Sequence, residues 1–94
     1  MKEFFNQLAV GNASVITVSN IGKLNQRALE LYEKEELTKE EIEDLKYIIM
    51  SCNILYNRTD MSILPVEDGF YDLLLEKYKK YDAHFQVGSA VVDF

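Results

Sequence analysis

The spacing of apolar residues in the middle of this 94-residue chain constrains its fold more than any other feature. Between Thr38 and Tyr56, apolar side chains recur every three or four residues, which places them on one face of an α-helix. Thr38 and Glu41 also have the spacing of a capping box, in which each side chain bonds the backbone N–H of the other residue, so we expect the helix to begin there. Its apolar face comprises Ile42, Leu45, Ile49, Cys52 and Tyr56, widened by Ile48 and Leu55.

Similar spacing predicts three further helices. We expect a short helix over residues 2–9, a long helix from residue 19 or 20 to about 36, and a last helix from residue 67 or 68 to about 82. The apolar faces of the last two are predicted to be Ile21, Leu24, Ala28 and Leu31, and Phe70, Leu73, Leu74, Tyr78 and Tyr81, respectively. Consecutive helices with short connections pack as antiparallel neighbours.

These helices predict a mainly α fold in which residues 1–94 form a single small helical domain. Two long antiparallel helices are followed by a loop that contains Pro65 and by a third helix. Residues 15–18 and 90–92 are rich in β-branched side chains and are candidates for a minor β pairing. The chain is 48% hydrophobic and 28% charged, with one proline and four glycines, which is typical of a folded domain.

The chain has one cysteine, Cys52, and one histidine, His84, and its sequence contains none of the common catalytic or metal-binding motifs. Cys52 lies on an apolar face, where a thiol is usually inert. We therefore expect no metal site and no catalysis from this chain alone. Because there is no apolar signal segment and no run of roughly 18 apolar residues, we expect a cytoplasmic protein that does not associate with a membrane.

The net charge of −6 is concentrated in residues 30–44, where eight acidic residues and two lysines also give −6. One interpretation is a solvated outer surface, with the glutamates, Asp44 and Lys46 of the central helix pointing to water. The other is a partner-binding patch that mimics a nucleic-acid backbone. Direct nucleic-acid binding by this chain is disfavoured, because such binding needs a surplus of cations. The residues of this patch are Glu33, Glu36, Glu40, Glu41, Glu43 and Asp44.

Tyrosines and aspartates gather where the central helix ends and the last helix begins. Tyr56 closes the first, while Asp68, Tyr71 and Asp72 open the second, and their spacings of three and four place Asp68 on the same face as Tyr71 and Asp72. Two tyrosines with carboxylates between them predict a cup for a flat, cationic ligand. The alternative is that Asp68 caps the helix and the tyrosines border the core.

Residues 38–88 resemble the N-terminal domain Ia of bacterial NAD-dependent DNA ligases, enzymes of DNA replication and repair. That family has a helix ending in Tyr-His, a loop with proline, and Asp-x-x-Tyr-Asp-x-Leu opening a second helix. This chain has Leu55-Tyr56-Asn57, then Pro65, then Asp68-Gly69-Phe70-Tyr71-Asp72-Leu73, and later Val87-Gly88. On this resemblance, residues 1–37 are an N-terminal helical extension and residues 89–94 a tail.

The resemblance implies that the domain binds the nicotinamide mononucleotide part of NAD during adenylation of the ligase. Tyr56 and Tyr71 would flank the nicotinamide ring, and Asp68 and Asp72 would bind the ribose, the surroundings of the phosphate or the amide. Asn57 stands where the family has histidine, and its amide can still form hydrogen bonds.

The Lys-x-Asp-Gly motif of the adenylation domain does not occur in this sequence, so the expected partner is an adenylation domain in cis or in trans. The alternative is a free-standing small acidic interaction or inhibitor protein that acts as a nucleic-acid mimic through residues 30–44. A third interpretation is a structural helical module without a ligand.

Overall fold

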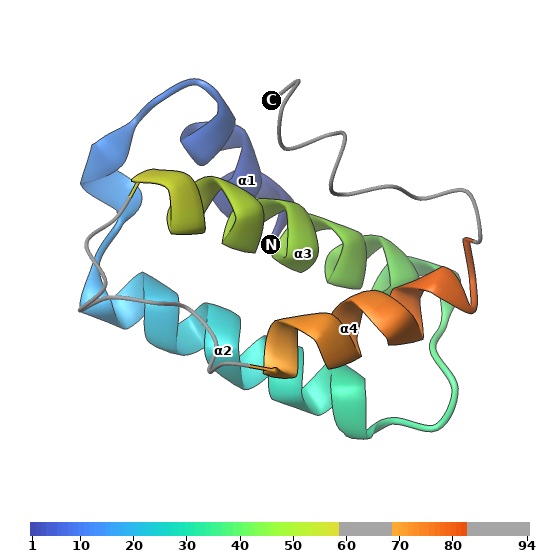
Figure 1. Ribbon diagram of the computed structural model, residues 1–94. Coiled ribbons are helices and arrows are strands. Elements are labelled where there is room, and N and C mark those ends of the chain that lie inside the picture. The colour runs from blue at the N-terminus through green and yellow to red at the C-terminus, as the bar shows by residue number, and fades with distance from the viewer. Residues whose placement is uncertain (59–68, 83–94) are drawn as a thin grey trace.

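The structure, a computed structural model, describes residues 1–58 and 69–82 (Figure 1). These residues form α1 (Lys2–Ala9), the short 3-10 helix η1 (Ala13–Val15), α2 (Val18–Glu33), α3 (Lys39–Arg58) and α4 (Phe70–Lys79). No strand occurs in this described part of the chain, which confirms the mainly α expectation. Predictions that involve Pro65, Asp68, His84 and the tail concern residues outside the described ranges.

The helix α3 lies at the centre of the fold. Figure 1 shows α2 and α3 running in opposite directions, joined by the turn at residues 34–38, and α4 running antiparallel to α3 and in the same direction as α2. Helix α3 packs against α1, α2 and α4, and α2 also packs against α4. The two long helices are therefore antiparallel neighbours, as the short connection predicts.

Because three helices surround it, α3 is buried on more than its predicted face. The side chains of Leu45, Ile48, Ile49, Cys52 and Leu55 are fully buried, in agreement with the apolar spacing. Ser51, Asn53 and Ile54 are buried as well. Two polar side chains thus lie in the interior, where the spacing of apolar residues gives no indication of them.

Helix α2 begins earlier than predicted. Thr17, not Ser19 or Asn20, is its N-cap, and the Thr17 hydroxyl oxygen accepts a hydrogen bond from the backbone N–H of Asn20 at 3.1 Å. The candidate strand at residues 15–18 is not formed, since Val15 ends η1 and Val18 begins α2. The four apolar residues predicted for this helix are its buried residues, and the helix ends at Glu33, before the predicted residue 36.

Helix α4 is shorter than predicted. It begins at Phe70, after Gly69 adopts a left-handed backbone conformation with φ of 86°. Leu74 and Tyr78 are buried, but the side chains of Leu73 and Tyr81 are 42% and 40% exposed. The predicted apolar face of this helix is therefore partly wrong: Leu73 faces outward, and Tyr81 lies beyond the last residue of the helix.

None of the helices in residues 1–58 and 69–82 combines the length and the apolar character that a membrane crossing requires.

Candidate functional site

Two of the predicted site residues, Tyr56 and Tyr71, meet where the last turns of α3 face the first turn of α4. Their ring centroids lie 5.6 Å apart and the ring planes are inclined by 81°, so the edge of one ring contacts the face of the other. Such an arrangement is favourable for aromatic pairs because of the ring quadrupoles. The fold thus joins two residues that are 15 positions apart in the sequence.

Asn53 holds this pair in place from the interior of α3. Its side chain is 8% exposed, and its amide nitrogen donates to the carbonyl oxygen of Ile49 at 3.1 Å and to the hydroxyl oxygen of Tyr71. The amide of Asn57 in turn donates to the carbonyl oxygen of Asn53 at 2.8 Å. Asn53 was not predicted from the sequence. The signal that could have found it is a polar residue three positions before Tyr56, within an apolar run.

Burial raises the pKa of Tyr71 to about 12, although the hydrogen bond from Asn53 opposes this rise. The hydroxyl group of Tyr71 is therefore protonated at neutral pH and can take part in hydrogen bonds both as donor and as acceptor.

The two rings contact each other, and in this structure they do not stand apart as the walls of an open cup. A flat ligand between two parallel rings needs about 7 Å between their planes, twice the usual van der Waals separation. A ligand of this kind therefore has to stack on an outer face of the pair. Asn57 and Asp72 are exposed beside the pair, whereas Asp68 lies outside the described residues.

The first turn of α4 adds a positive end to this site. Gly69 is the N-cap and has no side chain that could cap the helix. The first backbone N–H groups of a helix have no partner within the helix, and the helix dipole favours negative charge near them. An anionic group of a ligand that lies beside Tyr71 can therefore bind at this helix end.

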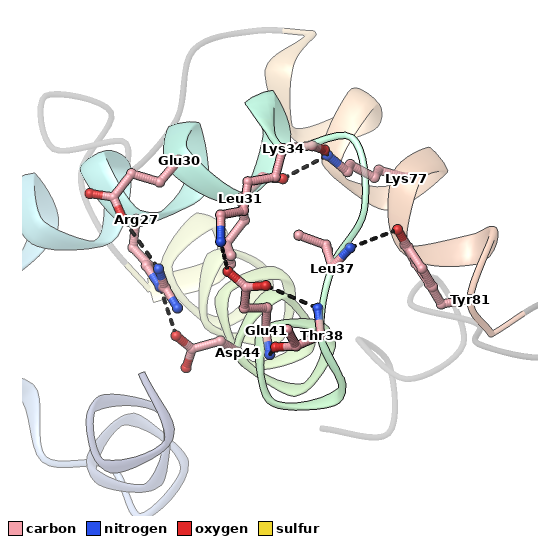
Figure 2. Close-up of polar contacts among 10 residues, drawn as sticks. All are labelled: Arg27, Glu30, Leu31, Lys34, Leu37, Thr38, Glu41, Asp44, Lys77 and Tyr81. Atoms are coloured by element: carbon pink, nitrogen blue, oxygen red, sulfur yellow. Dashed lines mark hydrogen bonds and ion pairs between the residues drawn. The ribbon is translucent and has the colours of Figure 1, made fainter.

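The acidic region at residues 30–44 divides into two parts (Figure 2). Glu41 turns inward and is 8% exposed: one carboxylate oxygen accepts from the backbone N–H of Thr38 at 2.9 Å, and the other pairs with Lys34. The backbone N–H of Glu41 donates to the Thr38 hydroxyl oxygen at 3.2 Å, which completes the predicted capping box. The hydrogen bond from Lys34, with that from Thr38, lowers the pKa of Glu41 to about 2.

Asp44 also forms ion pairs within the fold. Its carboxylate accepts from the Arg27 guanidinium at 2.9 Å and from the amine of Met1 at 3.1 Å, and Arg27 also pairs with Glu30 (Figure 2). Burial alone would raise the pKa of Asp44, but the two hydrogen bonds outweigh burial and hold this pKa below its usual value. The expectation that Glu41 and Asp44 point to water is therefore wrong, because each is held by cations from other segments.

The remaining residues of the predicted acidic patch do face solvent. Glu33, Glu36, Glu40 and Glu43 are exposed and form no ion pair with other described residues. These four residues border the turn between α2 and α3, and Lys77 of α4 binds the end of α2 beside this turn. The ammonium group of Lys77 donates to the carbonyl oxygens of Leu31 and Tyr32, each at 2.7 Å, and to that of Lys34.

The single cysteine, Cys52, lies buried in the core. Burial raises the pKa of the Cys52 thiol to about 12, so it is neutral and unreactive at physiological pH. Within the ranges that the structure describes, histidine, cysteine and carboxylate side chains form no group of three that could hold a metal ion. An open polar hollow of about 570 Å³ does exist, and its lining residues are Glu3, Phe4, Asn6, Gln7, Val15 and Asn20.

Comparison of the chain with protein-family models, with curated protein sequences and with solved structures finds no significant match.

Proposed function

We propose that this chain binds the nicotinamide mononucleotide part of NAD at the junction of α3 and α4 and assists an adenylation domain in cis or in trans, as ligase domain Ia does. The observation that carries the proposal is the contact between Tyr56 and Tyr71, which come from two helices and lie beside the exposed carboxylate of Asp72. A cytoplasmic location is part of the same proposal.

The chemistry of the site suits this ligand. The nicotinamide ring of NAD is flat and positively charged, so it is attracted to the face of a tyrosine and to a nearby carboxylate. The phosphate is attracted to the N-terminal end of α4, which begins at Phe70. Asn57 offers an amide that can bond the ribose or the phosphate.

Isothermal titration with NAD, nicotinamide mononucleotide and NADH tests the proposal. We expect NAD and the mononucleotide to bind and NADH to bind more weakly, because the reduced ring has lost its positive charge. If neither oxidised ligand binds at millimolar concentration, the proposal is wrong.

A pair of matched variants tests the position of the ligand. Asp72 and Glu76 are both exposed acids on α4, one turn apart. We expect Asp72→Asn to weaken binding of the mononucleotide by roughly three- to tenfold, the value of one partly exposed charged contact. Glu76→Gln removes the same charge outside the site and should leave the affinity unchanged. Equal effects of the two substitutions would place the ligand elsewhere.

The acidic interaction protein remains the second candidate, because four carboxylates of the patch are exposed and form no ion pair within residues 1–58 and 69–82. It predicts a protein partner whose affinity falls steeply as salt concentration rises. Glu40→Lys with Glu43→Lys reverses charge at exposed positions and should abolish this binding without unfolding the chain. Glu41 and Asp44 are unsuitable for this test, since their substitution breaks contacts within the fold.

A further inference from the structure

We infer that this chain forms a two-fold symmetric dimer through the seam between α2 and α4, so that the partner of this surface is a second copy of the chain. The seam is the line along which α4 lies against the C-terminal end of α2. Such a dimer does not depend on the binding of nicotinamide mononucleotide. Its residues are Leu29, Tyr32, Phe70, Leu73, Lys77 and Tyr81.

Three contacts define the seam. The ring of Tyr32 meets that of Phe70 with 5.3 Å between centroids, and the ammonium of Lys77 lies 5.7 Å from the centroid of the same Tyr32 ring. The hydroxyl oxygen of Tyr81 accepts from the backbone N–H of Leu37 at 3.3 Å, in the turn that follows α2 (Figure 2). One face of α4 therefore lies against the end of α2 from the first residue of α4 to just past its last.

Two leucines extend the apolar part of the seam. Leu73 lies on the same face of α4 as its neighbours in the seam, because it is three residues after Phe70 and four before Lys77. Leu29 is three residues before Tyr32 and shares its face of α2.

The seam leaves four large apolar side chains 36–49% exposed, and these are Leu29, Tyr32, Leu73 and Tyr81. They are four of the six exposed large apolar side chains in residues 1–58 and 69–82. Single apolar side chains on a surface are ordinary, whereas their concentration along one line is typical of an interaction surface.

Exposed charges of opposite sign flank the seam. Glu33 and Glu36 lie on the α2 side, and Lys79 and Lys80 lie on the α4 side. Burial and the charge of Lys80 both lower the pKa of Lys77, so Lys80 lies close to the seam. None of the two glutamates and the two exposed lysines forms an ion pair with another described residue.

A two-fold axis parallel to the seam makes this surface complementary to itself. Rotation by 180° about such an axis places the apolar side chains of one copy against those of the other, and the α2 side of each copy opposite the α4 side of its partner. The two lysines of each copy then face the two glutamates of the other. A partner with cations on both sides would meet Lys79 and Lys80 with like charge, which a second copy avoids.

The dimer is expected to be weak. Two chains of net charge −6 repel each other, and four partly exposed side chains make an interface smaller than the standard size of roughly 800 Å² per partner. We therefore expect a dissociation constant on the order of 100 µM. Sedimentation velocity of the full chain at concentrations from roughly 10 µM to 1 mM measures it. A chain that stays monomeric throughout this range would overturn the inference and leave the seam to a different partner.

Two serine variants test the position of the interface. Leu73→Ser removes an apolar side chain from the middle of the seam, and we expect it to weaken dimerisation by about tenfold or more. Val18→Ser is the matched control, because Val18 is 80% exposed and begins α2, at the end of that helix away from the seam. Circular dichroism checks that both variants are folded. Equal effects of the two substitutions on the dissociation constant would overturn the inference.

An exchange of charges tests how the two copies face each other. Lys79→Glu with Lys80→Glu places acids opposite acids, and Glu33→Lys with Glu36→Lys places cations opposite cations. Each double variant alone should dimerise at least about tenfold more weakly than the wild-type chain. An equal mixture of the two should form mixed dimers with an affinity close to that of the wild-type chain, because opposite charges then meet on both sides.

The mixture is the decisive measurement. If it dimerises no better than either variant alone, the α2 side does not face the α4 side and the inference is wrong. Should a double variant lose its helical circular dichroism, Lys80→Glu mixed with Glu33→Lys provides the same comparison with one exchanged pair.

Discussion

Ser51 places a hydroxyl group in the interior of the fold without a hydrogen-bond partner among the described residues. Its side chain is 0% exposed, like that of its neighbour Cys52. A buried polar group without a partner loses its hydration and gains nothing in return. Ser51 therefore costs stability, whereas the weakly polar Cys52 suits the same environment.

Substitutions at these two positions should have opposite effects. We expect Ser51→Ala to raise the free energy of unfolding by about 1 kcal/mol, since it removes the unpaired hydroxyl. Cys52→Ser adds a hydroxyl at a site of equal burial and should lower the free energy of unfolding by about 1–3 kcal/mol. Urea denaturation followed by circular dichroism measures both. Destabilisation by Ser51→Ala would show that the hydroxyl has a partner after all.

Glu41 links stability to acidic pH. The pKa of its carboxyl group is lowered from 4.5 to about 2 in the folded chain. Its charge therefore contributes stability that is fully present above pH 4.5 and is lost as the pH falls toward 2. We expect Glu41→Gln to be less stable than the wild-type chain at pH 7 and to lose less stability between pH 4.5 and pH 2.

Urea denaturation at a series of pH values measures this difference. The exposed neighbour Glu40 provides the control, and Glu40→Gln should follow the wild-type pH dependence. If Glu41→Gln also follows it, the ion pair with Lys34 and the bond to Thr38 do not control the acid response.

At the scale of single residues, sequence patterns predict the apolar interior and the capping box better than the polar contacts. Thr38 and Glu41 lie three positions apart, so their mutual bonds are a local property of the helix start. Asn53 turns toward Tyr71, and Asp44 toward Arg27, only because distant helices bring those partners close. A pattern in one helix carries no information about such contacts.

The start of α4 depends on the backbone of Gly69. Its φ of 86° lies in the left-handed region, which side chains disfavour, while no atom within 4 Å would obstruct an added Cβ. Gly22 lies inside α2, also in open space, and does not have a positive φ. The two glycines thus differ in backbone conformation and not in the space around them.

This contrast predicts opposite results for the same substitution. We expect Gly69→Ala to lower the free energy of unfolding by about 1 kcal/mol because of backbone strain. Gly22→Ala should raise the free energy of unfolding by about 0.5–1 kcal/mol, because alanine loses less conformational freedom in a helix. Thermal and urea unfolding of both variants measure the pair. Stabilisation by Gly69→Ala would mean that α4 begins with a different backbone conformation.

The existence of each described α-helix was predictable, whereas the 3-10 helix η1 was not, and the ends and outer faces of the α-helices were less predictable. Thr17, Ser19 and Asn20 are all residues that favour an N-cap, and only the path of the chain out of η1 selects Thr17. Leu73 fits an apolar face by spacing, yet it remains exposed because α4 packs through Leu74 and Tyr78. Which part of an apolar face is buried depends on the angle between helices.

In the whole molecule, the first 37 residues are part of the core and not an appendage to it. They supply Leu8 and the four buried residues of α2, which are five of the thirteen buried hydrophobic residues in the described chain. The helix α4 depends on them too. The ring of Phe70 contacts Tyr32 at 5.3 Å between centroids, and the ammonium of Lys77 caps the end of α2. The described residues on both sides of residue 38 therefore share one core.

A shortened chain of residues 38–94 should consequently fail to fold. Without α1 and α2, the fully buried side chains of Leu45 and Ile49 have fewer partners, and Lys77 loses the carbonyl groups that it binds. Small chains bury a smaller fraction of their surface and tolerate such losses poorly. We expect weak helical circular dichroism and no cooperative unfolding transition from residues 38–94 alone.

Adding a peptide of residues 1–37 to this shortened chain is the matched control, since it restores the missing contacts without the covalent link between residues 37 and 38. Helical signal should rise on mixing, and a cooperative transition should return at a midpoint that depends on concentration, as expected when folding requires association. Cooperative unfolding of residues 38–94 alone, at a midpoint close to that of the whole chain, would contradict this view. The helical extension would then be dispensable for the fold, and the tyrosine pair of α3 and α4 would need no support from α2.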